Sequence, residues 1–242
     1  MHMHMAMDII TTEPGIRAAT RLLTWLSPAF PVGGFSYSHG IEFAIEAGLV
    51  RDRASLGQWI EGILRFGAGR VDGMLLLAAH RAAQAGSVPE LLAVAHRAAA
   101  LRGTAELALE ATAQGQAFLK AVRHGWPEMA ATAPVTALAA DGVAVTYPIA
   151  VAVLTEAAGL AEETVLEAYL TAFTGNLISA GIRLVPLGQS DGIAAQAALE
   201  PLIARQVVRL RGEDFSNLGA AALAVDWTSM KHETQYTRLF RS

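Results

Sequence analysis

His39 and Glu42 are the side chains whose types and spacing come closest to a chemical site. They stand three positions apart, so on a helix they would face the same way. An imidazole and a carboxylate could hold a metal ion, pair with each other at a helix start, or contact a partner protein. A metal site needs a third ligand, and none stands nearby in the sequence. The residue types therefore favour polar pairing or a partner contact over metal binding.

Other groups able to do chemistry are sparse. His2 and His4 could bind a divalent metal only loosely. His232 and Glu233 are adjacent, so on a helix they would point in different directions. The absence of cysteine excludes disulfides, thiolate metal sites and cysteine nucleophiles. The chain also lacks a phosphate-binding P-loop, a Gly-x-Ser-x-Gly elbow and a His-Glu-x-x-His pair. We expect no catalytic activity and no tightly bound cofactor.

The segment that must position His39 and Glu42 is irregular before it becomes helical. Residues 26–42 contain two prolines and two glycines ahead of the polar cluster. A helix is predicted to begin near Ser36 or Tyr37, with the Ser36 hydroxyl as its cap. Such a segment is typical of a hinge rich in backbone contacts, and equally of a tight connection.

Beyond this segment the apolar residues recur at three- and four-residue steps almost everywhere, which predicts an all-α fold. Alternating patterns typical of strands are nearly absent. We expect a single compact multi-helix domain of about nine or ten helices over residues 17–212. Residues 1–16 are predicted to be disordered or tag-like, and residues 213–242 to form a C-terminal arm and docking tail. The predicted helices cover residues 17–26, 37–48, 54–67, 71–86, 88–100, 103–123, 145–159, 162–182 and 190–210.

Two further segments carry residue types that are enriched at protein interfaces. The tail over residues 229–242 combines Met, Tyr, Arg, Leu and Phe, and it could dock on a partner or fold back on its own domain. In residues 174–183, Gly175 and Ser179 lie one helical turn apart and would let another helix approach closely. Asn176 and Arg183 share a face that is either buried in the domain or used for self-association.

Composition limits the classes of partner. The net charge of −4 offers no basic footprint for nucleic acid. Only 17% of the residues are charged while 53% are hydrophobic, so we expect apolar surface to be covered by other proteins. Residues 22–41 lack Asp, Glu, Lys and Arg, but prolines and glycines within them argue against a membrane span. We expect a cytoplasmic protein.

Three blocks of sequence resemble the UreF family of urease accessory proteins. Residues 26–42, which include Phe-Ser-Tyr-Ser-His-Gly-Ile-Glu, resemble the N-terminal motif of that family. Residues 182–192, beginning Ile-Arg-Leu-Val-Pro-Leu-Gly-Gln, resemble its central segment, and residues 230–242 resemble its terminal His-Glu-x-Gln-Tyr-x-Arg-Leu-Phe-x-Ser. The blocks occur in the family's order across residues 21–242. One departure is Ile193, which stands where many relatives have Gln.

The resemblance implies an all-α protein without catalytic activity that forms a homodimer. It implies binding to the accessory GTPase UreG and to UreD/UreH, and support for GTP-dependent nickel insertion into apo-urease, with nickel handled in transit. Two alternatives remain: a helical metallo-enzyme that uses His39 and Glu42, and a helical scaffold unrelated to urease.

Residue roles carry over from the resemblance at the matching positions only. The GTPase contact is expected around Ser38, His39 and Glu42. The scaffold-docking residues are expected to be His232, Glu233, Tyr236, Arg238, Leu239 and Phe240. Candidates for the dimer or the nickel path are Gly175, Asn176, Ser179, Arg183 and Gln189.

Overall fold

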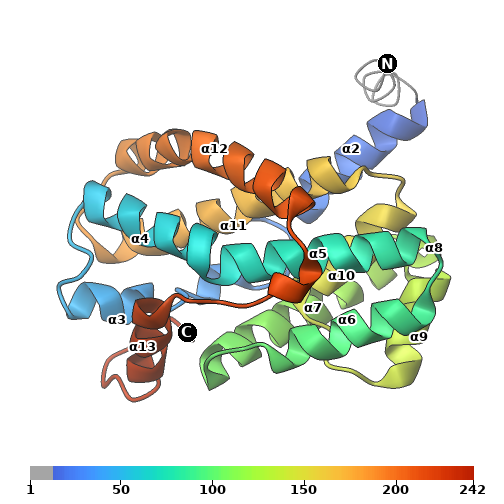
Figure 1. Ribbon diagram of the computed structural model, residues 1–242. Coiled ribbons are helices and arrows are strands. Elements are labelled where there is room, and N and C mark those ends of the chain that lie inside the picture. The colour runs from blue at the N-terminus through green and yellow to red at the C-terminus, as the bar shows by residue number, and fades with distance from the viewer. Residues whose placement is uncertain (1–12) are drawn as a thin grey trace.

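The structure, a computed structural model, describes residues 13–242 and contains helices and no strand within them (Figure 1). This confirms the predicted all-α class. The expectations for His2 and His4 lie outside the described residues. The helices are α2 (Glu13–Trp25), η1 (Gly34–Ser36), α3 (Ile41–Glu46), α4 (Arg53–Phe66), α5 (Ala68–Gln84), α6 (Val88–Ala100), α7 (Ala105–Gly125), α8 (Pro127–Ala130), α9 (Ala133–Asp141), α10 (Tyr147–Ala157), α11 (Glu162–Leu184), α12 (Gln189–Gly212), η2 (Phe215–Asn217) and α13 (Leu223–His232).

Helix α5 runs through the centre of the molecule. It packs most extensively against α10 and α6, and also against α4, α11 and α12 (Figure 1). Every residue from Val71 to Leu77 on α5 is buried, as is every residue from Pro148 to Thr155 on α10. Helices that are apolar on all sides belong in a protein interior. These two helices therefore form the middle of the core.

Two glycines permit close packing of elements around this core. A Cβ on Gly115 of α7 would lie 2.2 Å from the backbone oxygen of Val145. A Cβ on Gly181 of α11 would lie 2.6 Å from Leu56 of α4. At Gly115 the contact is with backbone and excludes a side chain, whereas at Gly181 the Leu56 side chain would have to move. The glycine that brings α11 close to another helix is thus Gly181, because a Cβ on Gly175 would come no closer than 3.7 Å to Gln196.

Helix ends follow local capping chemistry. The Asp52 side chain accepts a hydrogen bond from Ser55 N at 2.8 Å and starts α4. The Thr104 hydroxyl accepts from Leu107 N at 3.2 Å and starts α7.

No helix within residues 13–242 is long and apolar enough to cross a membrane.

Several predicted boundaries need correction. Helix α2 begins at Glu13, so residues 13–16 are helical. The helix predicted over 37–48 covers only Ile41–Glu46, because Gly40 before it has φ of 78°. The sequence reading missed α8, α9 and α13 altogether. The last of these lies within the segment that was predicted to be an arm.

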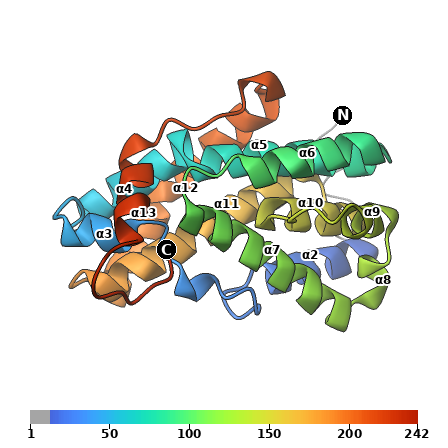
Figure 2. The same ribbon diagram turned by 90° about the horizontal axis from the view of Figure 1, so that it is seen from below.

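The chain returns to its own N-terminal half at the end. After α12, residues 213–222 cross α5 and lead to α13, which packs against α3 and α7 (Figures 1 and 2). Viewed from below, the C-terminus lies beside α13 and close to the first turns of α7 (Figure 2). This return brings the first and last blocks of the sequence together.

Candidate functional site

The turn before α3 presents Ser38, His39 and Glu42 in a fixed arrangement. His39 has φ of 57° and Gly40 has φ of 78°, so two successive residues adopt left-handed backbone. The helix therefore starts at Ile41 and not at Ser36 or Tyr37. The Ser38 hydroxyl accepts from Glu42 N at 3.3 Å, so Ser38 takes the capping role that the sequence assigned to Ser36.

His232 on α13 connects Glu42 to a second carboxylate on α7. Its Nε2 lies 3.0 Å from Oε2 of Glu42, and its Nδ1 lies 2.7 Å from Oε2 of Glu106. The ring is fully buried, and both carboxylates are nearly so. Each ring nitrogen therefore faces a carboxylate oxygen, and the imidazole bridges α3 and α7. The Arg238 guanidinium lies 3.0 Å from Oε1 of Glu106.

Glu42 also holds the backbone of the C-terminal segment. Its Oε1 accepts from Leu239 N at 2.7 Å, and its Oε2 accepts from Phe240 N at 2.9 Å. A buried carboxylate is tolerated when hydrogen bonds replace its hydration. Two backbone amides and the His232 ring provide such contacts to Glu42.

The segment continues as a short pairing with the turn before α3. Arg241 N donates to Ser36 O at 2.8 Å, and Ser38 N donates to Ser242 O at 2.8 Å. The Ser38 hydroxyl also donates to that oxygen. The Ser242 hydroxyl donates to Oε2 of Glu110 at 2.8 Å. We call the buried set of Ser38, Glu42, Glu106, Glu110, His232 and Ser242 the polar joint.

His39 lies at the edge of the polar joint. Its Nδ1 is 3.4 Å from Oε2 of Glu110 and makes no hydrogen bond there. The ring packs edge-on to Phe173 of α11, with 5.5 Å between centroids. Asp226 on α13 is half-buried, and burial raises its pKa although nearby His39 opposes the shift. Within residues 13–242, no group of three or more His, Cys, Asp or Glu side chains could hold a metal ion.

The tail residues divide into buried and exposed members. His232 and Phe240 are buried, whereas Leu239 is 64% exposed and Tyr236 is fully exposed. Glu233 and Arg238 are also exposed. The tail thus folds back on its own domain, one of the two alternatives that the sequence left open, while keeping Tyr236 and Leu239 outside. The partner-binding roles of these residues stay predictions.

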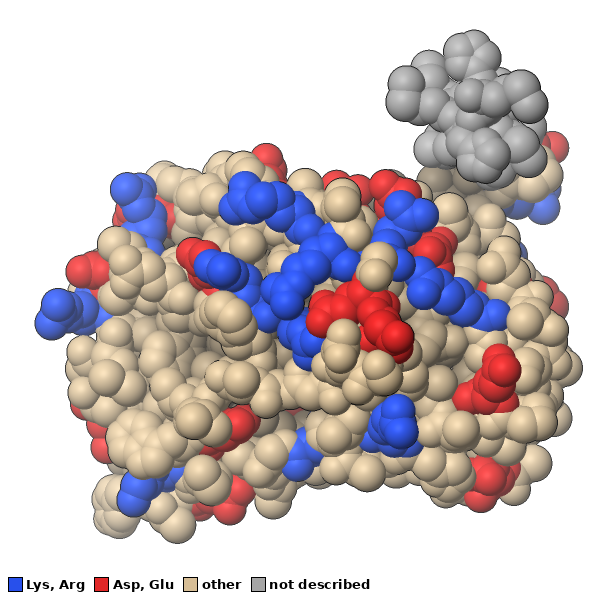
Figure 3. Space-filling view, in the orientation of Figure 1, with Lys and Arg blue, Asp and Glu red and all other residues tan. Residues whose placement is uncertain are grey.

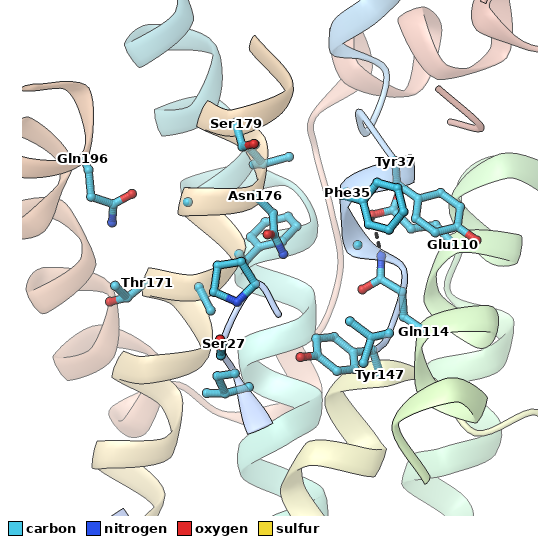
Figure 4. A pocket seen from close by; sticks show the side chains of 18 residues that line it. Ser27, Phe35, Tyr37, Glu110, Gln114, Tyr147, Thr171, Asn176, Ser179 and Gln196 are labelled. Carbon is cyan, nitrogen blue, oxygen red and sulfur yellow. Dashed lines mark hydrogen bonds between the residues drawn. The ribbon is translucent and has the colours of Figure 1, made fainter. Parts of the chain in front are cut away.

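The candidates on α11 lie mostly on one open face. Gly175, Asn176 and Ser179 line a pocket of about 350 Å³ between α11, α7 and the segment around η1. Figure 4 shows Asn176 and Ser179 on one side of this pocket and Gln114 and Tyr147 on the other. The large side chain at its edge is Phe35, 69% exposed.

Arg183 and Gln189 do not line this pocket. Arg183 donates to Phe35 O at 2.8 Å, and its guanidinium carbon lies 4.3 Å from the centroid of the Phe240 ring. It therefore connects α11 to the tail through a cation–π contact. Gln189 is exposed at the start of α12.

The sequence reading missed Glu106, Glu110 and Ser242, although each is buried in the polar joint. The two glutamates are four positions apart on α7, beside buried Leu107 and Ala111. Carboxylates on the inward face of a helix are rare unless they have partners. That placement was the available signal, but it does not identify the partners.

The fold and site define a class: an all-helical protein whose N-terminal turn and C-terminal segment are joined by buried polar groups. The model of the UreF family matches residues 50–200. The urease accessory protein UreF of Bradyrhizobium sp. strain BTAi1 is 47% identical over 231 residues, which cover 96% of this chain and 95% of the relative. The UreF protein of Rhodopseudomonas palustris strain BisA53 is 46% identical over 96% of this chain and 98% of its own length. That of Methylorubrum populi is also 46% identical, over 93% of this chain and 99% of its own length. The chain belongs to the UreF family of urease accessory proteins.

Proposed function

We propose that this protein is a non-catalytic, cytoplasmic chaperone of urease maturation. It binds the GTPase UreG and UreD/UreH and supports GTP-dependent insertion of nickel into apo-urease. Nickel is cargo handled together with the partners and not a resident cofactor. Family membership and the names of relatives that match nearly the whole chain support the urease connection.

The observation that carries the proposal is the double use of Glu42. Its carboxylate holds His232 and the amides of Leu239 and Phe240. The expected GTPase face around Ser38–Glu42 and the expected scaffold-docking tail are therefore one structural unit. A partner that pulls on the tail would change the hydrogen bonding of the turn before α3. This connection suits an adaptor that links the binding of two partners.

Burial assigns different tasks to the residues of that unit. Ser38, His39, Glu42, His232 and Phe240 are less than a tenth exposed, so they act by positioning the tail and the turn. Direct contact with UreD/UreH falls to the exposed side chains, Tyr236 and Leu239 foremost. Tyrosine is enriched among the residues that supply most of the binding energy at interfaces, and Leu239 adds apolar area beside it.

Self-association is proposed for the face of α11 that carries Gly175, Asn176 and Ser179. Phe35 beside it exposes a large aromatic surface, and such surface is commonly covered by a second protein chain. A twofold dimer would place the same face of each copy in contact.

Urease activation tests the function directly. Cells that lack this gene should produce apo-urease with little activity, and added nickel should not fully replace the protein. Full activity in the deleted strain at ordinary nickel would reject the proposal. Purified protein should also form a complex with UreG and UreD/UreH, and turnover of a substrate by the isolated chain would reject the non-catalytic role.

A double variant, Tyr236→Ala with Leu239→Ala, tests the docking tail more sharply than deletion of residues 230–242. Both side chains are exposed, so the polar joint stays intact, whereas deletion would also leave Glu42 without partners. UreD/UreH should bind the double variant at least about tenfold more weakly. Lys231→Ala, also exposed, is the control. Equal affinity for all three proteins would reject the docking role.

A further inference from the structure

A basic surface that shares no residue with the polar joint lies where α12 and α4 end. Arg65 and Arg209 stand in the last turns of α4 and α12, and their side chains are 44% and 47% exposed. Arg205, one helical turn before Arg209, is exposed and forms no ion pair within residues 13–242. Figure 3 shows basic side chains gathered on this side of the molecule around the end of α12. The whole chain has a net charge of −4, whereas basic side chains outnumber acidic ones on this surface.

A shallow pocket of about 260 Å³ lies within the basic surface. Arg70 lines this pocket, and its side chain is only 11% exposed. Its guanidinium donates to Asn217 O at 2.8 Å and to Gly219 O. Arg70 therefore fixes the segment between η2 and α13 against the core. The pocket is lined by Arg65, Phe66, Arg70, Arg209, Asn217, Gly219, Ala220 and Ala221.

The charges around the pocket do not cancel. Glu61 pairs with Arg65 at 2.9 Å, and Glu213 pairs with both Arg70 and Arg209. Three arginines thus face two carboxylates, and outside the pocket Arg205 on α12 and Asp214 before η2, both exposed, add one charge of each sign. Guanidinium groups bind carboxylates through paired N–H donors. The surface consequently favours an anionic partner.

The backbone at the pocket offers a second type of contact. Ala221 N donates to Phe66 O at 2.8 Å, and Gly219 O accepts from Arg70. Between them, the N–H and C=O of Ala220 make no hydrogen bond within the described part of the chain, and Ala220 is exposed. One free donor and one free acceptor on the same residue are what an added peptide backbone requires.

Apolar surface beside the arginines points to a protein segment as the occupant. Phe66 is 44% exposed, and the Arg65 guanidinium carbon lies 5.0 Å from the centroid of its ring. Val208, three positions after Arg205 and so on the same side of α12, is 71% exposed. A free phosphate would make no use of these side chains, whereas a peptide with alternating acidic and apolar residues would contact both kinds.

We propose that this surface binds an acidic, extended segment of a partner protein. Carboxylates of that segment pair with Arg65 and Arg209, its backbone pairs with Ala220, and its apolar side chains cover Phe66 and Val208. The proposal concerns a surface separate from the polar joint and does not depend on the function proposed above.

Fluorescence anisotropy of a labelled peptide of alternating glutamate and valine tests this binding. The double variant Arg65→Gln with Arg209→Gln should bind it about tenfold more weakly. Arg123→Gln is a matched control, because Arg123 is also exposed and in the last turn of a helix, and its affinity should equal that of the unmodified protein. A peptide with lysine in place of glutamate should not bind.

Hydrogen exchange supplies the readout for backbone pairing. The amide of Ala220 should exchange more slowly when the acidic peptide is bound, and inorganic phosphate at equal ionic strength should leave it unchanged. The proposal is overturned if the peptide does not bind or if the double variant binds it as well as the unmodified protein does. It is equally overturned if phosphate alone reproduces the slower exchange, which would indicate a simple anion site.

Discussion

The C-terminal tail, which completes the polar joint, and the open face of α11 both carry residue types typical of protein interfaces. In the structure they differ completely. The joint buries Ser38, Glu42 and His232 and satisfies them within the chain. The α11 face leaves Ser179 exposed beside a pocket of about 350 Å³. Interface-type residues can therefore join two parts of one chain as well as two chains.

The difference has an energetic consequence. In the joint, two carboxylates share one imidazole, and removal of that ring leaves buried carboxylate oxygens short of a hydrogen-bond partner. On the α11 face, water can replace any lost contact, so substitutions there should change folding stability little. Substitutions in the polar joint should lower folding stability more than substitutions on the α11 face. Substitutions on the α11 face should instead weaken binding between protein chains more than they change stability.

The largest effect is expected for His232→Ala. The change leaves buried oxygens of Glu42 and Glu106 without their shared hydrogen-bond partner, which should lower the free energy of unfolding by about 3 kcal/mol. Part of the loss would appear as release of the tail, seen as faster hydrogen exchange of the amides of Leu239 and Phe240. Urea denaturation and hydrogen exchange together measure both. Lys231→Ala is the control, and equal stability of the two variants would contradict the joint.

A smaller loss is expected for Gly40→Ala. Gly40 has φ of 78°, and a Cβ there would lie 2.8 Å from Oγ1 of Thr228 and 3.0 Å from Ser229 N on α13. Backbone strain and the contact with α13 should together cost about 2 kcal/mol. Gly48→Ala is a matched control, because Gly48 has φ of 72° but nothing within 4 Å of its would-be Cβ. If the melting temperature falls no further for Gly40→Ala than for Gly48→Ala, close contact between α13 and the turn before α3 does not affect stability.

The joint region also contains a group that opposes folding at neutral pH. Burial raises the pKa of Asp226, so the folded state holds its proton more tightly than the unfolded state does. The stability from this group is present below the unfolded pKa of about 3.9 and is lost as pH rises through the folded value. Asp226→Asn should therefore stabilise the protein at pH 7 by less than about 1 kcal/mol, because Asp226 is only half-buried and water screens it. The gain should shrink as pH falls towards 4, and a gain independent of pH would exclude this cause.

Sequence patterns predicted the central helices well because burial there is apolar and periodic. Helix α13 was missed for the opposite reason. It buries Thr228, Ser229 and His232 and exposes Leu223, Trp227 and Met230. A helix with polar groups inward has no recognisable apolar face towards the core. Its inward side can be understood only with the carboxylates that it meets, which lie far away in sequence.

Two other misses have local causes. The start of α3 was placed too early because nothing in the sequence shows that His39 would adopt positive φ, a conformation uncommon outside glycine. Helix α9 had usable signals: Thr132 precedes it, Pro134 lies in its first turn, and Gly142 ends it with φ of 75°. These match the usual preference for proline at helix starts and glycine after helix ends. Its weak apolar periodicity hid them.

The smallest effect on stability and the clearest on assembly are expected for Ser179→Arg. Ser179 is exposed on α11, so the free energy of unfolding should change by no more than about 0.5 kcal/mol. A long charged side chain on a self-associating face would nevertheless meet its own copy across the twofold axis and separate the dimer. Light scattering after gel filtration should show the molar mass fall from two chains to one. Gln116→Arg, exposed on α7, should leave the mass unchanged; if Ser179→Arg does so as well, the α11 face is not the dimer contact.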